Sequence, residues 1–268
     1  MWLLRALFGL APKQAAVAPP IQPRPPLPRP PLPRPQTPVC VIGDLHGMDD
    51  LLRAMLALVA AQPGADAARI IFVGDLVDRG PDTAAVLLRV RGLCETNPAH
   101  TICLMGNHER MMLDFLADPA GRGKRWIAAG GAATLIGYGI TARTDAATPA
   151  ARFVALADAL RAALPHGMLD WLGALPLFWQ DGPFGVVHAG ADPALPLPDQ
   201  PGAALIWGHP RFHTTARTDG LWIAHGHVIV PQVQIAQGRI AVDTGAYRTG
   251  RLSALWLDGD GARVLQVT

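Results

Sequence analysis

The sequence predicts an α/β fold, an α+β sandwich in which two mixed β-sheets pack together with helices on their outer faces. Short apolar runs alternate with helical patterns up to about residue 107, and this order predicts parallel strands joined by right-handed crossovers. From about residue 184 the chain turns to short strands and tight turns, which predict hairpins. A chain that begins as β-α-β units and ends as hairpins favours two mixed sheets in one domain.

The first 38 residues differ in composition from the rest of the chain. They repeat the unit Arg-Pro-Pro-Leu-Pro and carry five basic residues and no acidic one, which leaves 18 basic and 21 acidic residues beyond them. Repeated prolines fix φ and remove backbone donors, so we expect a disordered, basic, proline-rich tail over 1–38. A folded domain over 39–268 follows, and its charge balance predicts no nucleic-acid partner. Any weak contact with a membrane or an adaptor domain would come from residues 1–38.

The three cysteines, Cys40, Cys94 and Cys103, include no CxxC pair. An odd number without close pairing argues against a disulfide framework and predicts a reducing, cytoplasmic location. Cys40 and Cys103 lie inside apolar runs, where we expect them to pack in the core.

The elements are expected in the following order. Buried strands are predicted over 39–43, 69–74 and 100–106, each ending in glycine followed by polar residues. Helices are predicted over 48–62, capped by Asp49 or Asp50, and over 81–94, with Pro81 in the first turn. The region 108–175 is predicted to be helical with a glycine-rich break at 130–139. Hairpin strands are predicted over 221–245 and 252–267.

The expected strand ends carry a recurring set of polar residues. The six that could bind metal are Asp44 and His46 in GDLHG, Asp75 in GDLVDRG, Asn107 in GNHE, His188 in VVHAG and His227 in AHGHV. Ligands in α/β sheets gather at the carboxyl ends of strands. This mixture of oxygen and imidazole ligands suits Mn²⁺, Fe or Zn²⁺ better than Ca²⁺. Six ligands would serve two ions, about 3.5–4 Å apart, if one carboxylate bridges them.

The ordered motifs GDLHG, GDLVDRG, GNHE, HAG and GH resemble those of the calcineurin-like metallophosphoesterases over about residues 39–260. The nearest match is the phosphoprotein phosphatase branch in its compact bacterial and phage form. The resemblance implies that Asp44, His46 and Asp75 bind one metal. It implies that Asp75 bridges to a second metal, which is completed by Asn107, His188 and His227.

The resemblance also assigns roles to the residues that remain. His108 would protonate the leaving oxygen, and Asp78 would orient His108. Arg79 would hold two phosphate oxygens, with Asn107 also facing the phosphate. A metal-bridging hydroxide would attack phosphorus directly, without a phospho-enzyme intermediate.

Two positions depart from the family pattern. His209, in IWGHPRF, stands where a second phosphate-binding arginine is expected, two residues after the tryptophan. Arg211 could substitute for it, which is the interpretation we slightly favour, or His209 could act as a weaker, pH-dependent clamp, or activity could be reduced. His225, in HGHV, precedes the ligand position and is expected to support or pack against the site.

Three functions remain open. The leading hypothesis is a protein serine/threonine phosphatase with two divalent ions, Mn²⁺ in preference to Fe or Zn²⁺, that acts on phosphoproteins or phosphorylated small molecules. The alternative is a symmetrical dinucleoside tetraphosphate hydrolase, because that group also has HAG followed soon by proline, as in HAGADP here. A scaffold protein that kept the fold is the third hypothesis, and six intact ligand positions argue against it.

Overall fold

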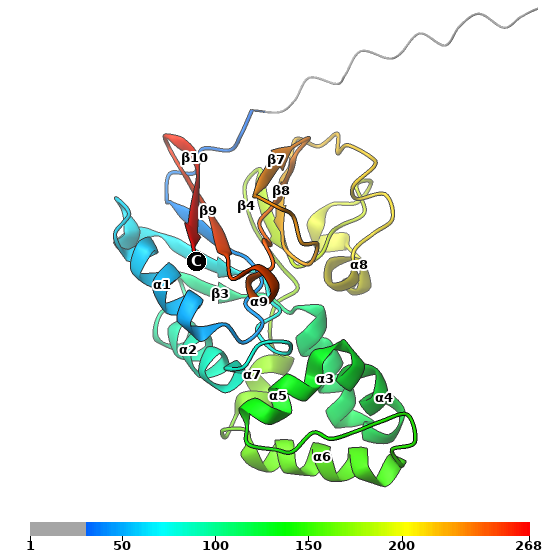
Figure 1. Cartoon of the computed structure of the whole chain (residues 1–268). Helices are drawn as coiled ribbons and strands as arrows, with labels where there is room; N and C mark the ends of the chain where they lie inside the picture. The colour runs from blue at the N-terminus through cyan, green and yellow to red at the C-terminus, as the bar shows by residue number, and fades with distance from the viewer. Residues whose placement is uncertain (1–30) are drawn as a thin grey trace, which may run out of the picture.

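The computed structural model describes residues 31–268, and these form two five-stranded mixed sheets with helices around them (Figure 1). In the first sheet the spatial order is β10-β9-β1-β2-β3, from Gly261–Val267, Leu252–Asp258, Val39–Ile42, Arg69–Phe72 and Thr101–Cys103. In the second sheet the order is β4-β5-β6-β8-β7, from Phe178–Asp181, Phe184–Val187, Trp222–His225, Arg239–Ala241 and Gln234–Ala236. The predicted fold class is therefore confirmed.

Each sheet joins parallel strands to an antiparallel hairpin. Strands β1, β2 and β3 are parallel, whereas β9 pairs with β1 and with β10 in antiparallel register. In the second sheet β5, β6 and β8 are parallel, and β4 and β7 are the antiparallel edges. The β7–β8 hairpin turns at Gln237-Gly238, and both residues have positive φ, as a tight two-residue turn requires.

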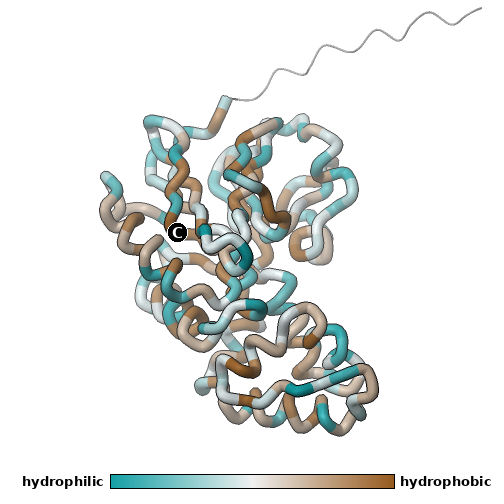
Figure 2. The backbone as a smooth tube through the Cα atoms, in the orientation of Figure 1, coloured by the Kyte–Doolittle hydropathy of each residue, from teal (hydrophilic) through white to brown (hydrophobic). Residues whose placement is uncertain are grey.

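The core has two layers because the strands are apolar on both faces. Along β1, Val39 and Val41 pack between the two sheets, whereas Cys40 and Ile42 face the helices on the outer side of the first sheet. This alternation follows from the two-residue period of a strand. Figure 2 shows hydrophobic residues concentrated along the strands of both sheets. Cys40 and Cys103 are buried and free, as predicted.

Helices cover the outer faces. The first sheet is covered by α1 (Asp49–Ala60) and α2 (Thr83–Thr96), and the second by α8 (Gly202–Trp207) with the short 3₁₀ turn Leu197–Asp199. A helical lobe lies below the sheets in Figure 1; it comprises α3 (Asn107–Ala117), α4 (Pro119–Trp126), η2 (Ile127–Gly131, a π-helix), α5 (Ala132–Gly137), α6 (Ala150–Ala163) and α7 (Met168–Gly173). The predicted break in this region falls at Gly130, which leaves helical geometry. No helix within residues 31–268 combines the length and apolar character needed to cross a bilayer.

Two predicted helix starts differ from the structure. Helix α1 is preceded by Met48, and Asp49 lies in its first turn, where its carboxylate binds the guanidinium of Arg89 instead of capping the helix. Pro81 precedes α2, which begins at Thr83 after Asp82. Both differences arise from contacts across the fold that local patterns do not encode.

Residues 31–38, which we call the strap, were assigned to the disordered tail but pack against the body. Pro33 is buried, Leu32 packs against the core between the sheets, and Trp222 Nε1 donates to the carbonyl oxygen of Pro31 at 3.1 Å. Burial of the apolar side chain of Leu32 against this core favours an ordered strap. The rest of the predicted tail, residues 1–30, lies outside the described residues.

Candidate metal centre and active site

The predicted ligands meet where the parallel strands of both sheets end. Asp44 and His46 follow β1, Asp75 follows β2, Asn107 begins α3 after β3, His188 follows β5 and His227 follows β6. Of the six non-glycine residues with positive φ among those described, five lie at this site: His46, Asp75, Asp78, Arg79 and His227. Such conformations are costly and persist where the surrounding structure enforces them, which is common at functional sites.

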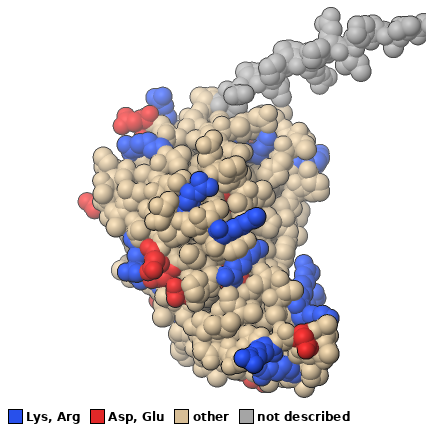
Figure 3. All heavy atoms as spheres, viewed as in Figure 1, with Lys and Arg blue, Asp and Glu red and all other residues tan. Residues whose placement is uncertain are grey.

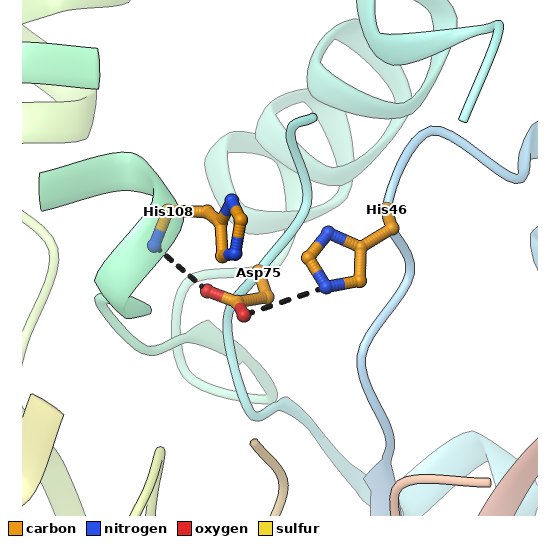
Figure 4. A group of neighbouring side chains, drawn as sticks. All are labelled: His46, Asp75 and His108. Atoms are coloured by element: carbon orange, nitrogen blue, oxygen red, sulfur yellow. Dashed lines mark hydrogen bonds and ion pairs between the residues drawn. The ribbon is translucent and has the colours of Figure 1, made fainter. Parts of the chain in front are cut away.

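The first cluster contains His46, Asp75 and His108, whose potential ligand atoms lie within 4.8 Å of one another (Figure 4). His46 Nε2 is 3.5 Å from Asp75 Oδ2, and the backbone N–H of His108 donates to Asp75 Oδ1 at 3.0 Å. Nδ1–H of His46 donates to the carbonyl oxygen of Val77 at 2.8 Å, so Nε2 carries the lone pair that a metal ligand needs.

The second cluster contains Asp75, His188 and His227, and Asn107 lies within it. Oδ1 of Asn107 is 2.9 Å from both His188 Nε2 and His227 Nδ1, and His188 Nε2 is 3.5 Å from Asp75 Oδ1. Asp75 therefore belongs to both clusters, which is the position that a bridging ligand would occupy.

The donor set of the second cluster fits a cation. Nδ1–H of His188 donates to the carbonyl oxygen of Val73 at 2.9 Å, and burial lowers the pKa of this imidazole, so its Nε2 carries a lone pair. That Nε2 faces Oδ1 of Asn107, which also carries lone pairs. Two acceptors at this separation repel each other, and a cation bound by both atoms would relieve the repulsion.

The buried carboxylates fit a cation as well. Asp44, Asp75, Glu109 and Asp243 are all buried. Burial, followed by the negative charges of Asp243 and Asp75, raises the pKa of Asp44 well above its ordinary value. Burial also lowers the pKa of His46 to about 3, which keeps this ring neutral, as a metal ligand must be. Buried charge of one sign is costly without a counter-charge, which divalent cations would supply.

Asp44 lies beside the second cluster without joining it in this arrangement. Its two carboxylate oxygens accept the backbone N–H of His227, at 3.1 and 3.2 Å. The structure thus brings all six predicted ligands into one region, with Asp44 oriented by the loop that also carries His227.

The residues assigned to proton transfer are in direct contact. Nδ1 of His108 is 2.7 Å from Oδ2 of Asp78, and both side chains are buried. Burial alone would lower the pKa of His108, but the neighbouring carboxylates of Asp75 and Asp78 raise it. The bond to Asp78 occupies Nδ1 and leaves Nε2 as the ring nitrogen that is available for a substrate.

Arg79 lies at the edge of the first cluster. Its guanidinium stacks over the ring of Tyr247, 4.8 Å from the centroid, and Nη1 is 3.2 Å from Nε2 of His46. Tyr247 also contacts His46 edge-on, with 5.1 Å between ring centroids. The predicted clamp is therefore next to the metal ligands and is supported by an aromatic ring from α9 (Ala246–Thr249).

His209 and Arg211, the two candidates for a second clamp, are both directed at Asp192. Arg211 Nη2 donates to the two carboxylate oxygens of Asp192 at 2.7 and 2.9 Å, and His209 Nε2 is 3.6 Å from the same carboxylate. Neither makes a hydrogen bond to Arg79 or to a predicted ligand within residues 31–268. His225 packs against Phe212 and His213 and lies outside both clusters.

Sequence reasoning missed two supporting residues. The buried carboxylate of Glu109 accepts four backbone N–H groups, from Asp75, Leu76, Val77 and Gly106, and so holds the loop that carries Asp75. Its place three residues after Gly106, at a helix start, was the available signal. Tyr247 carried no signal, because an aromatic residue after a turn indicates no particular role.

The sequence matches the calcineurin-like phosphoesterase family model over residues 37–239, and the chain belongs to this family. The predicted resemblance is thereby confirmed at the level of the family, and the fold of this family implies a dinuclear centre for divalent metal ions. The identity of the metal is a separate question.

Two curated relatives have the names of different enzymes. The chain is 31% identical over 156 residues to a symmetrical bis(5′-nucleosyl)-tetraphosphatase of Methylococcus capsulatus, covering 58% of this chain and 44% of the relative. It is 37% identical over 93 residues to serine/threonine-protein phosphatase 2 of Escherichia coli, covering 35% of this chain and 38% of the relative. The matched part spans less than half the length of each relative.

A solved structure supports the fold. A crystal structure provisionally assigned as a diadenosine tetraphosphatase aligns with a TM-score of 0.60 at 19% identity, covering 88% of this chain and 96% of the other. At this identity the likeness concerns the fold alone.

Proposed function

We propose that this metallophosphoesterase hydrolyses symmetrical dinucleoside tetraphosphates, with water adding across the central phosphoanhydride. The observation that carries the hydrolytic chemistry is Asp75, which lies in both ligand clusters. The alignment with a symmetrical tetraphosphatase over 58% of this chain supports the substrate. It supports the alternative that the sequence left open better than the leading hypothesis of a protein phosphatase.

We assign each group of site residues one role in the reaction. Two divalent ions, for which we propose Mn²⁺ with Fe or Zn²⁺ as alternatives, would be held by Asp44, His46, Asp75, Asn107, His188 and His227. Bound there, such ions lower the pKa of water and offset phosphate charge. Arg79 would bind two phosphate oxygens beside the centre, and Asn107 would contribute its amide to the phosphate. His108, oriented by Asp78, would hold a proton at Nε2 for the leaving oxygen.

Charge near the site suits a polyanionic substrate. Figure 3 shows several basic side chains near the middle of the visible face, in the region where α9 lies in Figure 1. Arg248 and Arg79 belong to this region, because α9 carries Arg248 and its Tyr247 ring contacts Arg79. Positive charge beside a site raises the local concentration of anions and their association rate.

A second candidate is phosphoprotein hydrolysis by the same centre. The segment that matches the Escherichia coli phosphatase at 37% identity favours it. The two candidates differ in the group that leaves: a nucleoside diphosphate in the first, and a serine or threonine hydroxyl in the second.

The test compares kcat/KM for diadenosine tetraphosphate, a phosphoserine peptide and p-nitrophenyl phosphate, each with added Mn²⁺. We expect diadenosine tetraphosphate to be the best substrate and ADP to be its only nucleotide product. ATP with AMP would indicate asymmetric cleavage and contradict the proposal, and a higher kcat/KM for the phosphopeptide would favour the second candidate. Asp75→Asn should abolish all three activities, whereas Asp50→Asn, at an exposed position on α1, serves as the control. A metal-loaded protein that is inactive on all three would indicate a scaffold.

A further inference from the structure

Beyond α3, the helical lobe also contacts the active site at the carboxylate of Asp78. Oδ2 of Asp78 accepts Nε1–H of Trp126 at 3.0 Å, in addition to its contact with His108. Oδ1 accepts the hydroxyl of Thr134 at 2.7 Å. Asp78 is completely buried, so these donors and His108 replace the water that an exposed carboxylate would have.

The hydroxyl of Thr134 is committed to this arrangement. It has one proton, which it donates to Asp78 Oδ1, and it accepts the backbone N–H of Asp78 at 2.9 Å. The hydroxyl of Thr83 lies 3.4 Å away and must be the donor in that contact, because the only proton of Thr134 is already used. Thr134 thus holds both the backbone and the side chain of Asp78, whose φ of 70° is unfavourable for a residue with a side chain.

The glycine-rich break between α4 and α5 allows the lobe to approach this closely. Gly130 has a φ of 121°, a Cβ there would lie 2.8 Å from Cγ of Arg79, and its carbonyl oxygen accepts the backbone N–H of Arg79 at 3.2 Å. A Cβ on Gly131 would overlap the indole of Trp126. The break therefore brings Trp126 and Thr134 within hydrogen-bonding distance of the Asp78 carboxylate. Its Gly130 also binds the backbone of Arg79, the residue after Asp78.

We propose that Trp126 and Thr134 are positioning residues for the reaction: their two hydrogen bonds fix the Asp78 carboxylate so that His108 presents Nε2 to the leaving oxygen. This inference rests on the proposed role of His108. A carboxylate held by three donors from different elements can accept from His108 in only one orientation, whereas a carboxylate held by His108 alone could rotate with the ring. The indole also stacks on Phe115, with 4.4 Å between ring centroids, so its packing can be separated from its hydrogen bond.

The experiment uses the dependence of rate on the leaving group in the Mn²⁺-loaded full-length protein. A proton donor matters most when the leaving oxygen is strongly basic. The rates for a phenyl ester, with a basic leaving group, and for a 2,4-dinitrophenyl ester, with a weakly basic one, are therefore compared. Both are prepared as aryl phosphates or as aryl esters of ADP, whichever series the enzyme hydrolyses. The variants are Trp126→Phe, which removes the indole N–H together with part of the ring, and Thr134→Val, which removes the hydroxyl at nearly constant shape. Thr134→Ser is the rescue variant, and Phe115→Leu changes the packing of the indole without removing a donor. Mn²⁺ content and Tm are measured for each protein.

We expect Trp126→Phe and Thr134→Val to lower kcat for the phenyl ester about ten-fold more than for the dinitrophenyl ester, since each loses a hydrogen bond to a charged group. KM and Mn²⁺ content should remain as in the parent, Thr134→Ser should restore the rate, and Phe115→Leu should affect both esters equally. Equal losses on both esters in Trp126→Phe and Thr134→Val would overturn the inference, as would loss of Mn²⁺ in these variants.

His108→Asn separates this inference from the proposed function. If His108→Asn discriminates between the two esters but Trp126→Phe and Thr134→Val do not, only the inference fails. If His108→Asn lowers both rates equally, the proton-donor role of His108 is itself wrong, and the inference fails with it.

Discussion

Asp75 contacts residues of both ligand clusters, and its surroundings explain how one carboxylate can do so. It lies in the loop after β2, its φ is positive, and its own N–H donates to the carboxylate of Glu109. The candidate metal ligands and the candidate proton-transfer residues therefore lie close to one another but contact different groups. Substituting the former should change metal binding, whereas substituting the latter should change turnover.

Metal binding and turnover should separate on substitution. We expect Asn107→Ala and His188→Ala to lower the metal content, because each removes a donor from the second cluster. His108→Asn should keep the metal and lower kcat by about 10²- to 10⁴-fold, the usual contribution of a positioned proton donor. Elemental analysis of the purified variants, combined with kcat, checks this division. Equal metal loss in all three variants would contradict it.

The two arginine candidates should also separate. Arg79→Ala should lower kcat/KM by about 30- to 1,000-fold, corresponding to roughly 2–4 kcal/mol for a charged hydrogen-bonding partner of phosphate. Arg211→Ala should change kcat/KM much less, because its guanidinium is bonded to Asp192. Steady-state kinetics at fixed ionic strength measures both. A large loss in Arg211→Ala would show that Arg211 turns to the phosphate when substrate binds.

The pH dependence of the metal-free protein should report on Asp243. Burial raises the pKa of Asp243 to about 6 from 3.8, and Gly245 donates its N–H to Oδ1 at 2.7 Å. Because the native pKa is raised, the stabilising effect of the protonated form is complete below about pH 4 and is lost as the pH rises through about 6. At neutral pH the ionised group then destabilises the metal-free protein by roughly 2–3 kcal/mol.

Asp243→Asn removes this titration and keeps an acceptor for Gly245. In EDTA, the variant should be more stable than the parent at neutral pH, and the difference should vanish near pH 4. Urea unfolding at several pH values measures it, with the exposed Asp50→Asn as the control. A difference that does not change with pH would show that Asp243 does not titrate in this range.

At the scale of elements, the loops after the strands carry the site and the helices hold those loops. The first turn of α3 supplies Asn107 and His108, and Glu109 in the same turn binds the loop after β2. The strand and helix patterns were predictable because they are local and periodic. The packing of the strap was not predictable, because proline-rich composition alone does not show which residues contact an apolar surface.

The strap yields a stability prediction. Leu32→Ala should lower the free energy of unfolding by about 1–2 kcal/mol, less than for a fully buried leucine, because the side chain is only partly enclosed. Deletion of residues 1–30 should leave Tm unchanged if the tail is separate from the folded domain, as its composition predicts. Differential scanning calorimetry measures both, and Gln36→Ala, at an exposed position of the strap, is the control. An unchanged Tm in Leu32→Ala would show that the strap does not stabilise the fold.

At the scale of the whole molecule, the centre joins elements from both sheets, so metal should stabilise the entire fold. Removing metal with EDTA should lower Tm, and Mn²⁺ at about 100 times its Kd should restore about 2.7 kcal/mol for each ion bound. We expect two ions per chain, which elemental analysis and anomalous scattering would count. Unchanged Tm on chelation, with metal removal confirmed, would contradict the expected coupling. One ion per chain would require a different arrangement of ligands.

The place of the six candidate ligands was predictable from the sequence, because each follows an apolar strand that ends at a shared edge. Asp44, His46, Asp75, Asn107, His188 and His227 were all expected at this edge, and all six lie there. The groups that hold Asp78 could not be identified from the sequence, because Trp126 and Thr134 reach Asp78 from 48 and 56 residues away. No local pattern marks a side chain whose partner is so distant.

The sequence by itself determined the β-α-β order of the first elements, the hairpins β7–β8 and β9–β10, and the set of residues able to bind metal, because strand periodicity and strand-end chemistry are local properties. The prediction of a hairpin strand is wrong for β6, which is parallel to both of its neighbours. The tertiary structure alone decided that Asp75 lies in both clusters, that Arg211 is bonded to Asp192, and that the helical lobe reaches Asp78. These contacts depend on how two sheets and a lobe pack against one another, and that packing depends on the whole chain.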